Sequence, residues 1–157
     1  MNTKQRKITI IAVLSLSMLA FIIFCYIRFS MYAKWEKIDL SSCVICDDTI
    51  CEIERIEDSD YIFIKGYAYF QDAKKIHAGI VLTDSETGES FAVPTEPVLR
   101  EDLRNTYDFS EINDIGFVAR VSKDSMQDGE NRYEIGYLHE LDDGSLGYTK
   151  TTTKLGK

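Results

Sequence analysis

The feature that most constrains this 157-residue chain is an uninterrupted apolar segment, residues 8–27, with the sequence ITIIAVLSLSMLAFIIFCYI. No charged side chain occurs in it. A helix rises about 1.5 Å per residue, so a helix of this length spans about 30 Å, the thickness of the hydrocarbon core of a bilayer. A buried core helix rarely runs so far without a charge. The segment therefore predicts a transmembrane helix, preceded by a short cytoplasmic tail at residues 1–7.

A cleaved signal peptide is the main alternative to a permanent anchor. Lys4, Arg6 and Lys7 supply the basic start that such peptides have. However, their apolar region is only roughly 7–15 residues long and leads to a small-x-small cleavage site. The nearest candidate site here contains Met31 and Ala33 and fits that pattern poorly. We interpret residues 8–27 as an uncleaved signal anchor.

The flanking charges favour neither orientation strongly, because three basic residues precede the segment and Arg28, Lys34 and Lys37 follow it. The α-amino group tips the balance toward a cytoplasmic N-terminus. We therefore expect a single-pass plasma-membrane protein whose residues 38–157 lie outside the cytoplasm. Aromatic rings favour the headgroup region, and we expect this position for Tyr26, Tyr32 and Trp35.

The part of the chain after the anchor is acidic and long enough for one domain. Residues 38–157 carry twelve Lys/Arg and twenty-five Asp/Glu, a net charge of −13. Such a domain repels phosphate backbones, which excludes nucleic acid as a partner. The acids are scattered, which favours a role in solubility over attraction of cations or of a basic partner.

Alternating hydrophobicity predicts β-strands in this domain. Residues 61–70, YIFIKGYAYF, have two apolar faces, which is typical of a central strand. Similar runs separated by turn residues give about seven strands. They predict an all-β, immunoglobulin-like antiparallel β-sandwich over residues 49–157, behind a stalk at residues 28–48. Residues 98–107 are the one helix-like patch.

Four short motifs occur in a characteristic order: Gly66-Tyr67-Ala68, Arg100-Glu101-Asp102-Leu103, Gly116-Phe117, and Asp128-Gly129 followed by Tyr133-Glu134-Ile135-Gly136. Over residues 60–140 the chain resembles a β-sandwich module of Gram-positive surface proteins, typically G-W-A, R-x-D-V, G-F and L-x-x-G-x-Y-x-I. Many such modules are uncharacterised, and they often stand beside membrane segments or envelope-glycan enzymes. The resemblance implies an accessory or binding role and supplies no catalytic residues.

Cys43, Cys46 and Cys51 are the candidate disulfide cysteines, because an extracytoplasmic location favours oxidation. Any single pairing leaves one thiol over. A thiol-redox role for Cys43 and Cys46 lacks the βαβ setting that activates a CxxC pair. Zinc would require a fourth ligand. For His77 and His139, the only histidines, we expect solvent-facing positions on strands. We therefore expect neither a metal nor another cofactor.

The aromatic face formed by Tyr61, Phe63, Tyr67 and Tyr69 is the candidate binding surface, because flat rings along a strand can stack on a sugar or a partner protein. The alternative is a second packed layer. For Arg100 and Asp102 we expect a structural ion pair. The acid-rich turns at Asp84-Glu86 and Asp142-Asp143 lack the spacing of a calcium loop and are typical of hairpin turns.

No catalytic motif is present in the sequence. The sequence therefore favours a non-enzymatic, membrane-anchored accessory module that contacts an envelope protein or glycan. Two alternatives remain. One is a thiol-redox protein using Cys43 and Cys46. The other is a structural subunit of a membrane complex, in which small residues of the anchor allow close helix approach.

Overall fold

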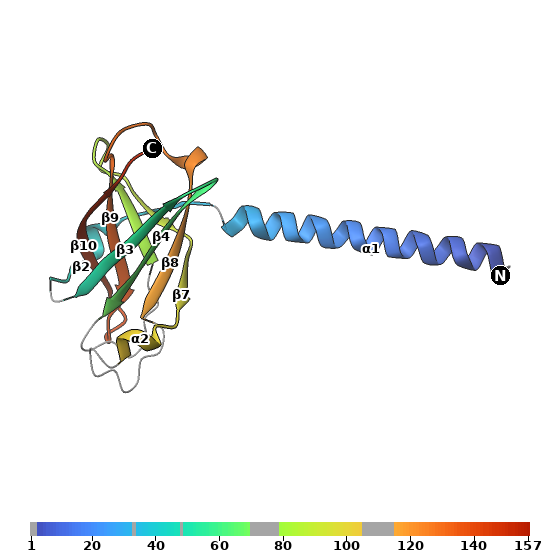
Figure 1. The fold of residues 1–157 in the computed structure, drawn as a ribbon, viewed down its shortest axis with the longest axis horizontal. Coiled ribbons are helices and arrows are strands. Elements are labelled where there is room, and N and C mark those ends of the chain that lie inside the picture. The colour runs from blue at the N-terminus through green and yellow to red at the C-terminus, as the bar shows by residue number, and fades with distance from the viewer. Residues whose placement is uncertain (1–2, 33, 48, 70–78, 105–114) are drawn as a thin grey trace. The chain divides into compact units, whose positions relative to one another are not determined.

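The computed structural model describes residues 3–32, 34–47, 49–69, 79–104 and 115–157, and it divides the chain into two units, Met1–Ala33 and Lys34–Lys157. The first unit is helix α1, Thr3–Tyr32, drawn in blue in Figure 1. Within it Thr9–Arg28 is long and apolar enough to cross a membrane, and none of it is buried by protein. This span agrees with the expected residues 8–27 to within one residue at each end.

Two hydroxyl groups of α1 form hydrogen bonds within the helix itself. Thr9 Oγ1 donates to the carbonyl oxygen of Gln5 at 3.0 Å, and Ser17 Oγ donates to that of Leu14 at 2.8 Å. A helix already pairs its backbone groups internally, which a bilayer interior requires. The two hydroxyl groups therefore add no unsatisfied donor to the apolar span.

The second unit is mostly β-structure arranged in two sheets (Figure 1). The described strands are β1 Glu36–Ile38, β2 Val44–Ile45, β3 Ile50–Asp58, β4 Tyr61–Tyr69, β5 Gly79–Asp84, β6 Ser90–Val93, β7 Thr95–Val98, β8 Gly116–Ser122, β9 Tyr133–Glu140 and β10 Leu146–Leu155. One turn of helix, α2 Glu101–Arg104, and two 3-10 turns, η1 Leu40–Ser42 and η2 Lys123–Ser125, complete the described elements.

One sheet has the strand order β1-β6-β5-β9-β10-β2, and the other has the order β3-β4-β8-β7. Every neighbouring pair is antiparallel except β10 with β2, which is parallel. Strand β4 pairs with β3 on one side and β8 on the other. This position agrees with the central strand expected at residues 61–70.

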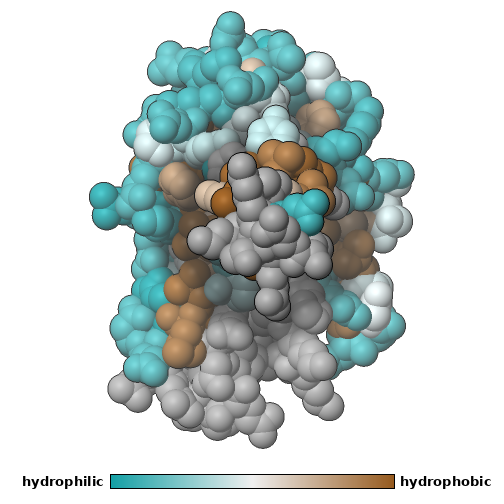
Figure 2. All heavy atoms as spheres, turned by 90° about the vertical axis from the view of Figure 1, so that its right-hand side faces the viewer, coloured by the Kyte–Doolittle hydropathy of each residue, from teal (hydrophilic) through white to brown (hydrophobic). Residues whose placement is uncertain are grey.

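The inner faces of both sheets share one hydrophobic core, as the alternation of buried side chains along each strand shows. The four-stranded sheet contributes Ile62, Ile64, Ala68, Phe117, Ala119 and Val121, and the six-stranded sheet contributes Ile80, Leu82, Val93, Tyr133, Ile135 and Tyr137. On the face drawn in Figure 2, hydrophilic side chains cover most of the described surface of the β-domain, in keeping with its acidic composition.

The structure differs from the expected layout in the strand number and at the start of the domain. About seven strands were expected, and the described residues contain ten. The described residues of the expected stalk, 28–32 and 34–47, belong to other elements: α1 continues to Tyr32, β1 pairs with β6, and β2 pairs with β10. These two strands escape sequence analysis because three and two residues are too few to display a period. The β-domain therefore begins at Lys34 and not at residue 49.

Candidate functional site

The expected aromatic face lies on the outer side of β4, where charged side chains cover part of it. Tyr67 is only 6% exposed, and its hydroxyl donates to Glu52 Oε2 at 2.5 Å. The guanidinium carbon of Arg100 lies 5.6 Å from the centre of the same ring. That of Arg120 lies 3.8 Å from the ring centre of Tyr61.

The other two members of this face, Phe63 and Tyr69, are half-buried. The four rings are thus packed into the surface of the sheet to different depths. They do not form an evenly exposed row on which a ligand could stack.

Arg100 and Asp102 form an ion pair that includes a third residue, Glu54. Arg100 donates to Asp102 from Nε at 2.8 Å and from Nη2 at 2.7 Å, and to both carboxylate oxygens of Glu54 at 2.5 and 2.9 Å. Hydrogen bonds from Arg100 lower the pKa of the Asp102 carboxyl group. The Arg100 side chain also lies against Gly116, where an added Cβ would come within 2.5 Å of its Cγ. Arg100 therefore joins the strands β3, β4 and β8 on the outer face.

The cysteines in the described residues are free thiols. Burial raises the pKa of Cys51 to about 12. Burial, followed by the nearby charge of Asp39, also raises the pKa of Cys43. A reactive cysteine needs a lowered pKa, so the raised pKa of Cys43 weighs against a thiol-redox role for Cys43 and Cys46. No cluster of three or more His, Cys, Asp or Glu that could hold a metal occurs among the described residues.

His139 does not face solvent, contrary to the expectation. It is 1% exposed on the inner face of β9 and stacks on Tyr137 with ring centres 6.2 Å apart. Burial lowers its pKa to about 4. The expectation was wrong because the period-two alternation of Tyr133, Ile135 and Tyr137 continues to His139 and places it on the same, buried face of β9. The other histidine, His77, lies outside the described residues.

The acid-rich turns use their carboxylates for hydrogen bonds to the backbone. Asp84 Oδ1 accepts from the backbone nitrogens of Glu86 at 2.8 Å and Thr87 at 3.4 Å. Asp143 Oδ1 accepts from the backbone nitrogen of Ser145 at 2.9 Å and from its hydroxyl group at 2.6 Å. Both turns thus have the hairpin role expected from the sequence.

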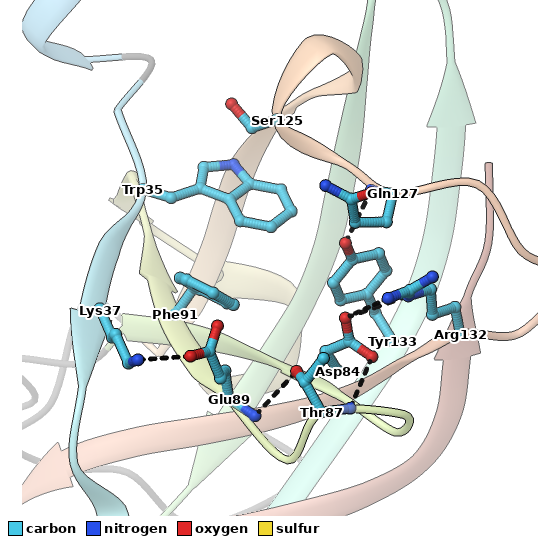
Figure 3. A pocket seen from close by; sticks show the side chains of 10 residues that line it. All are labelled: Trp35, Lys37, Asp84, Thr87, Glu89, Phe91, Ser125, Gln127, Arg132 and Tyr133. Carbon is cyan, nitrogen blue, oxygen red and sulfur yellow. Dashed lines mark hydrogen bonds and ion pairs between the residues drawn. The ribbon is translucent and has the colours of Figure 1, made fainter.

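A pocket that the sequence analysis missed lies within the β-domain, between β1, the β5–β6 hairpin and the η2 turn (Figure 3). Its volume is about 510 Å³, within the roughly 300–1,000 Å³ of small-molecule sites. Trp35 forms one wall and lies beside Phe91 and Tyr133, with ring centres 5.5 and 5.6 Å away. Trp35 thus packs on the β-domain, although its position after the anchor suggested a membrane-interface role.

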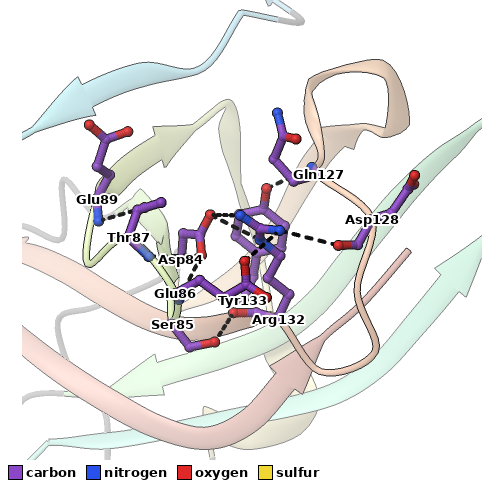
Figure 4. A network of polar contacts seen from close by, with 9 residues as sticks. All are labelled: Asp84, Ser85, Glu86, Thr87, Glu89, Gln127, Asp128, Arg132 and Tyr133. Carbon is purple, nitrogen blue, oxygen red and sulfur yellow. Dashed lines mark hydrogen bonds and ion pairs between the residues drawn. The ribbon is translucent and has the colours of Figure 1, made fainter.

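The polar side of the pocket is organised by Arg132 and Asp84 (Figure 4). Arg132 donates to Asp84 Oδ2 from Nε at 3.0 Å and from Nη2 at 2.8 Å, and its Nη1 lies 2.9 Å from Glu86 Oε2. The Asp84 side chain is only 5% exposed. The hydrogen bonds from Arg132 hold the pKa of Asp84 below its ordinary value, although burial acts in the opposite direction.

The remaining polar contacts of the pocket hold its rim. Lys37 Nζ lies 2.5 Å from Glu89 Oε1, which links β1 to the β5–β6 hairpin. The backbone nitrogen of Gln127 donates to the hydroxyl group of Tyr133 at 2.8 Å, which ties the segment after η2 to β9. Each pocket element is therefore held by at least one contact to another element.

One hydrogen-bond donor beside the pocket has no acceptor among the described residues. The indole Nε1 of Trp35 is buried and has no hydrogen-bond partner among the residues that the structure describes. Figure 3 shows the nitrogen edge of the indole pointing toward the η2 turn that carries Ser125. Trp35 is the single tryptophan of the chain. Its isolation just after the anchor was the only sequence signal for this site.

Comparison with known proteins finds no family whose pattern matches the chain, no matching curated protein and no matching solved structure. The pocket geometry therefore carries the functional argument.

Proposed function

We propose that this chain is a non-enzymatic, single-pass membrane-anchored binding module whose extracytoplasmic β-domain contacts a cell-envelope protein or glycan. The observation that carries the proposal is the mixed aromatic and polar pocket around Trp35, so close in the chain to an apolar membrane-spanning helix. The resemblance of the residue 60–140 motifs to Gram-positive surface modules supports the same role.

The pairing of charges in the pocket supports binding over catalysis. Asp84 is held by Arg132, and Glu89 is held by Lys37. A general acid or base needs a carboxyl group whose pKa is raised toward neutral pH. The pKa of Asp84 is shifted in the opposite direction.

The short connection between anchor and pocket supports a site near the bilayer. Trp35 lies seven residues after Arg28, the last residue of the apolar span. Even a fully extended chain covers at most about 3.6 Å per residue, so Trp35 stays within about 25 Å of the end of that span. Any ligand of the pocket must therefore come within a few nanometres of the membrane.

We also propose an immunoglobulin-like topology for the domain. If β3 to β10 are lettered A, B, C, C′, D, E, F and G, the two sheets have the orders A-B-E-D and C′-C-F-G. These are the neighbour relations of immunoglobulin sandwiches. Strands β1 and β2 then extend the second sheet at its two edges. Domains of this architecture commonly serve recognition at cell surfaces, which supports the proposed role by analogy.

Site-specific photo-crosslinking of the full chain in its native membrane tests the function. A photoreactive residue at Ser125, on the pocket rim, should give an adduct with an envelope protein or glycan. The matched position is Glu96, an exposed residue of β7 that does not line the pocket, and it should give none. Equal labelling from both positions, or an adduct from neither, would contradict the proposal.

A further inference from the structure

The rim of the pocket indicates one property of a ligand. The side chains of Ser125 and Gln127 are exposed and line the pocket. A hydroxyl group and an amide group can each donate and accept hydrogen bonds. The Nε1 atom of Trp35 is closed to solvent and does not take part. A ligand at this rim should therefore carry hydroxyl or carbonyl oxygens.

The charges indicate a second property, electrical neutrality. The two cationic side chains of the pocket, Lys37 and Arg132, are each within 3 Å of a carboxylate, Glu89 and Asp84 respectively, and Arg132 also contacts Glu86. An anionic ligand would have to displace these carboxylates. A cationic ligand would have to displace Lys37 or Arg132. The arrangement therefore favours a neutral ligand that forms hydrogen bonds.

The walls indicate a third property, a combination of apolar and polar faces. Two half-buried rings, Trp35 and Phe91, line the pocket together with the buried ring of Tyr133, and the exposed side chains of Ser125 and Gln127 stand on its rim (Figure 3). A sugar ring has C–H faces that pack on aromatic rings and hydroxyl groups at its edge. The volume of about 510 Å³ is large enough for a small saccharide.

We propose that the Trp35 pocket binds a neutral sugar ring that packs on the aromatic wall and forms hydrogen bonds with Ser125 and Gln127. This proposal rests on the binding role proposed above and specifies its ligand class. The same chemistry is offered by a wall glycan and by the headgroup of a membrane glycolipid. The distance of at most about 25 Å from the apolar span keeps both sources in reach.

The single tryptophan makes the test direct, because the fluorescence of the full chain reports on this pocket alone. The chain in phosphatidylcholine nanodiscs is titrated with cellobiose, with N,N′-diacetylchitobiose and with inorganic phosphate. A second set of nanodiscs contains diglucosyl diacylglycerol. We expect a saturable change in emission with at least one disaccharide or with the glycolipid, and none with phosphate. Response to a free disaccharide identifies a wall glycan, and response to the glycolipid alone identifies a headgroup.

Variants assign the response to named groups. Gln127→Ala and Ser125→Ala keep the fluorophore and alter exposed side chains, so they should weaken binding by up to about tenfold, equal to 1.4 kcal/mol. Glu96→Ala is the matched control and should bind like the unmodified chain. Trp35→Phe keeps an aromatic ring but reduces the area of the wall on which the sugar packs. Its affinity, measured by saturation-transfer NMR, should fall by about tenfold.

A response to phosphate but not to the sugars would overturn the proposal, and so would unchanged affinity in Trp35→Phe together with Gln127→Ala. These outcomes are separate from failure of the proposed function. A chain that gives a specific adduct at Ser125 but no sugar response remains a binding module with another ligand. A chain that gives neither loses both proposals.

Discussion

At the scale of single residues, a buried aspartate and a buried histidine face the space between the sheets at opposite ends of the β5–β9 pair. Asp84 lies opposite Tyr133, and His139 lies one residue beyond Leu138, the partner of Gly79. Asp84 stays charged because Arg132 donates two hydrogen bonds to it. His139 stays neutral near pH 7 because burial lowers its pKa to about 4.

The pKa of His139 predicts a loss of stability in mild acid. Between its ordinary pKa of 6.5 and about 4, the unfolded chain binds a proton at this residue that the folded chain does not. The free energy of unfolding therefore falls as pH falls through this window. His139→Gln should flatten that dependence in thermal unfolding of the full chain followed by Trp35 fluorescence. An unchanged slope between pH 6.5 and 4 would show that other groups cause it.

The lowered pKa of Asp84 affects stability at a lower pH than that of His139 does. The contributions of the two residues can therefore be measured separately. A carboxyl group whose folded pKa lies below its ordinary 3.8 contributes stability above that value, and the contribution disappears as pH falls through the folded pKa. His139→Gln should thus leave the decline below about pH 4 intact.

Two glycines on strands predict opposite responses to an added methyl group. A Cβ at Gly66 would lie 2.1 Å from the carbonyl oxygen of Glu52, whereas a Cβ at Gly79 meets nothing within 4 Å. Gly66→Ala should lower the free energy of unfolding by about 2 kcal/mol or more, because overpacking forces the backbone to shift. Gly79→Ala should be neutral or slightly stabilising. Denaturant unfolding of the full chain in detergent measures both, and equal effects would contradict this account.

At the scale of elements, strand β4 is held on its outer face by a bulge in β3. The register of the pair shifts between Ile53 and Arg55, which leaves Glu54 without a partner across the ladder. Bulges re-aim side chains, and Glu54 is the carboxylate that receives two hydrogen bonds from Arg100. Arg100 in turn covers Tyr67. The aromatic face of β4 is therefore partly a second packed layer.

The packing of β4 predicts that its tyrosines differ in structural importance. Tyr67→Ala removes a buried ring and its hydrogen bond to Glu52, and it should cost about 3 kcal/mol of unfolding free energy. Tyr69→Ala, at a half-buried position, should cost clearly less. Thermal unfolding compares the two. Equal losses, or the larger loss in Tyr69→Ala, would indicate that the cover of Arg100 over Tyr67 contributes little.

At the scale of the whole molecule, an apolar helix precedes an acidic β-domain, and the charges beside the helix favour neither orientation strongly. The proposed extracytoplasmic location of the domain therefore rests on the positive charge that the α-amino group adds before the helix. It is a direct premise of the envelope-binding proposal, because a cytoplasmic β-domain cannot reach a wall glycan.

Cysteine labelling in intact cells tests the orientation. In a background with every native cysteine replaced by serine, Asp142→Cys in the exposed β9–β10 turn should react with a membrane-impermeant maleimide. Gln5→Cys, before the apolar span, should react only after the cells are opened. The reverse pattern would place the β-domain in the cytoplasm and remove the proposed function.

Much of the fold could be predicted because local patterns carry it. The alternation of residues 61–70 places Ile62 and Ile64 in the core, and the turn at residues 85–88 joins β5 to β6. The helix follows from length and hydropathy alone. The candidate site could not be predicted, because its walls come from residues as distant as Trp35, Phe91 and Tyr133. No periodicity in the sequence indicates that these three residues lie together.

The sequence by itself determined that the chain has an apolar membrane-length helix and an acidic, strand-rich remainder, because period and composition are local properties. Only the tertiary structure decided which distant segments pack together. It placed Arg100 over Tyr67 and drew the supposed stalk into the six-stranded sheet. Burial depends on contacts between distant segments, and the same contacts turned Trp35 from an expected membrane-interface residue into the wall of a pocket.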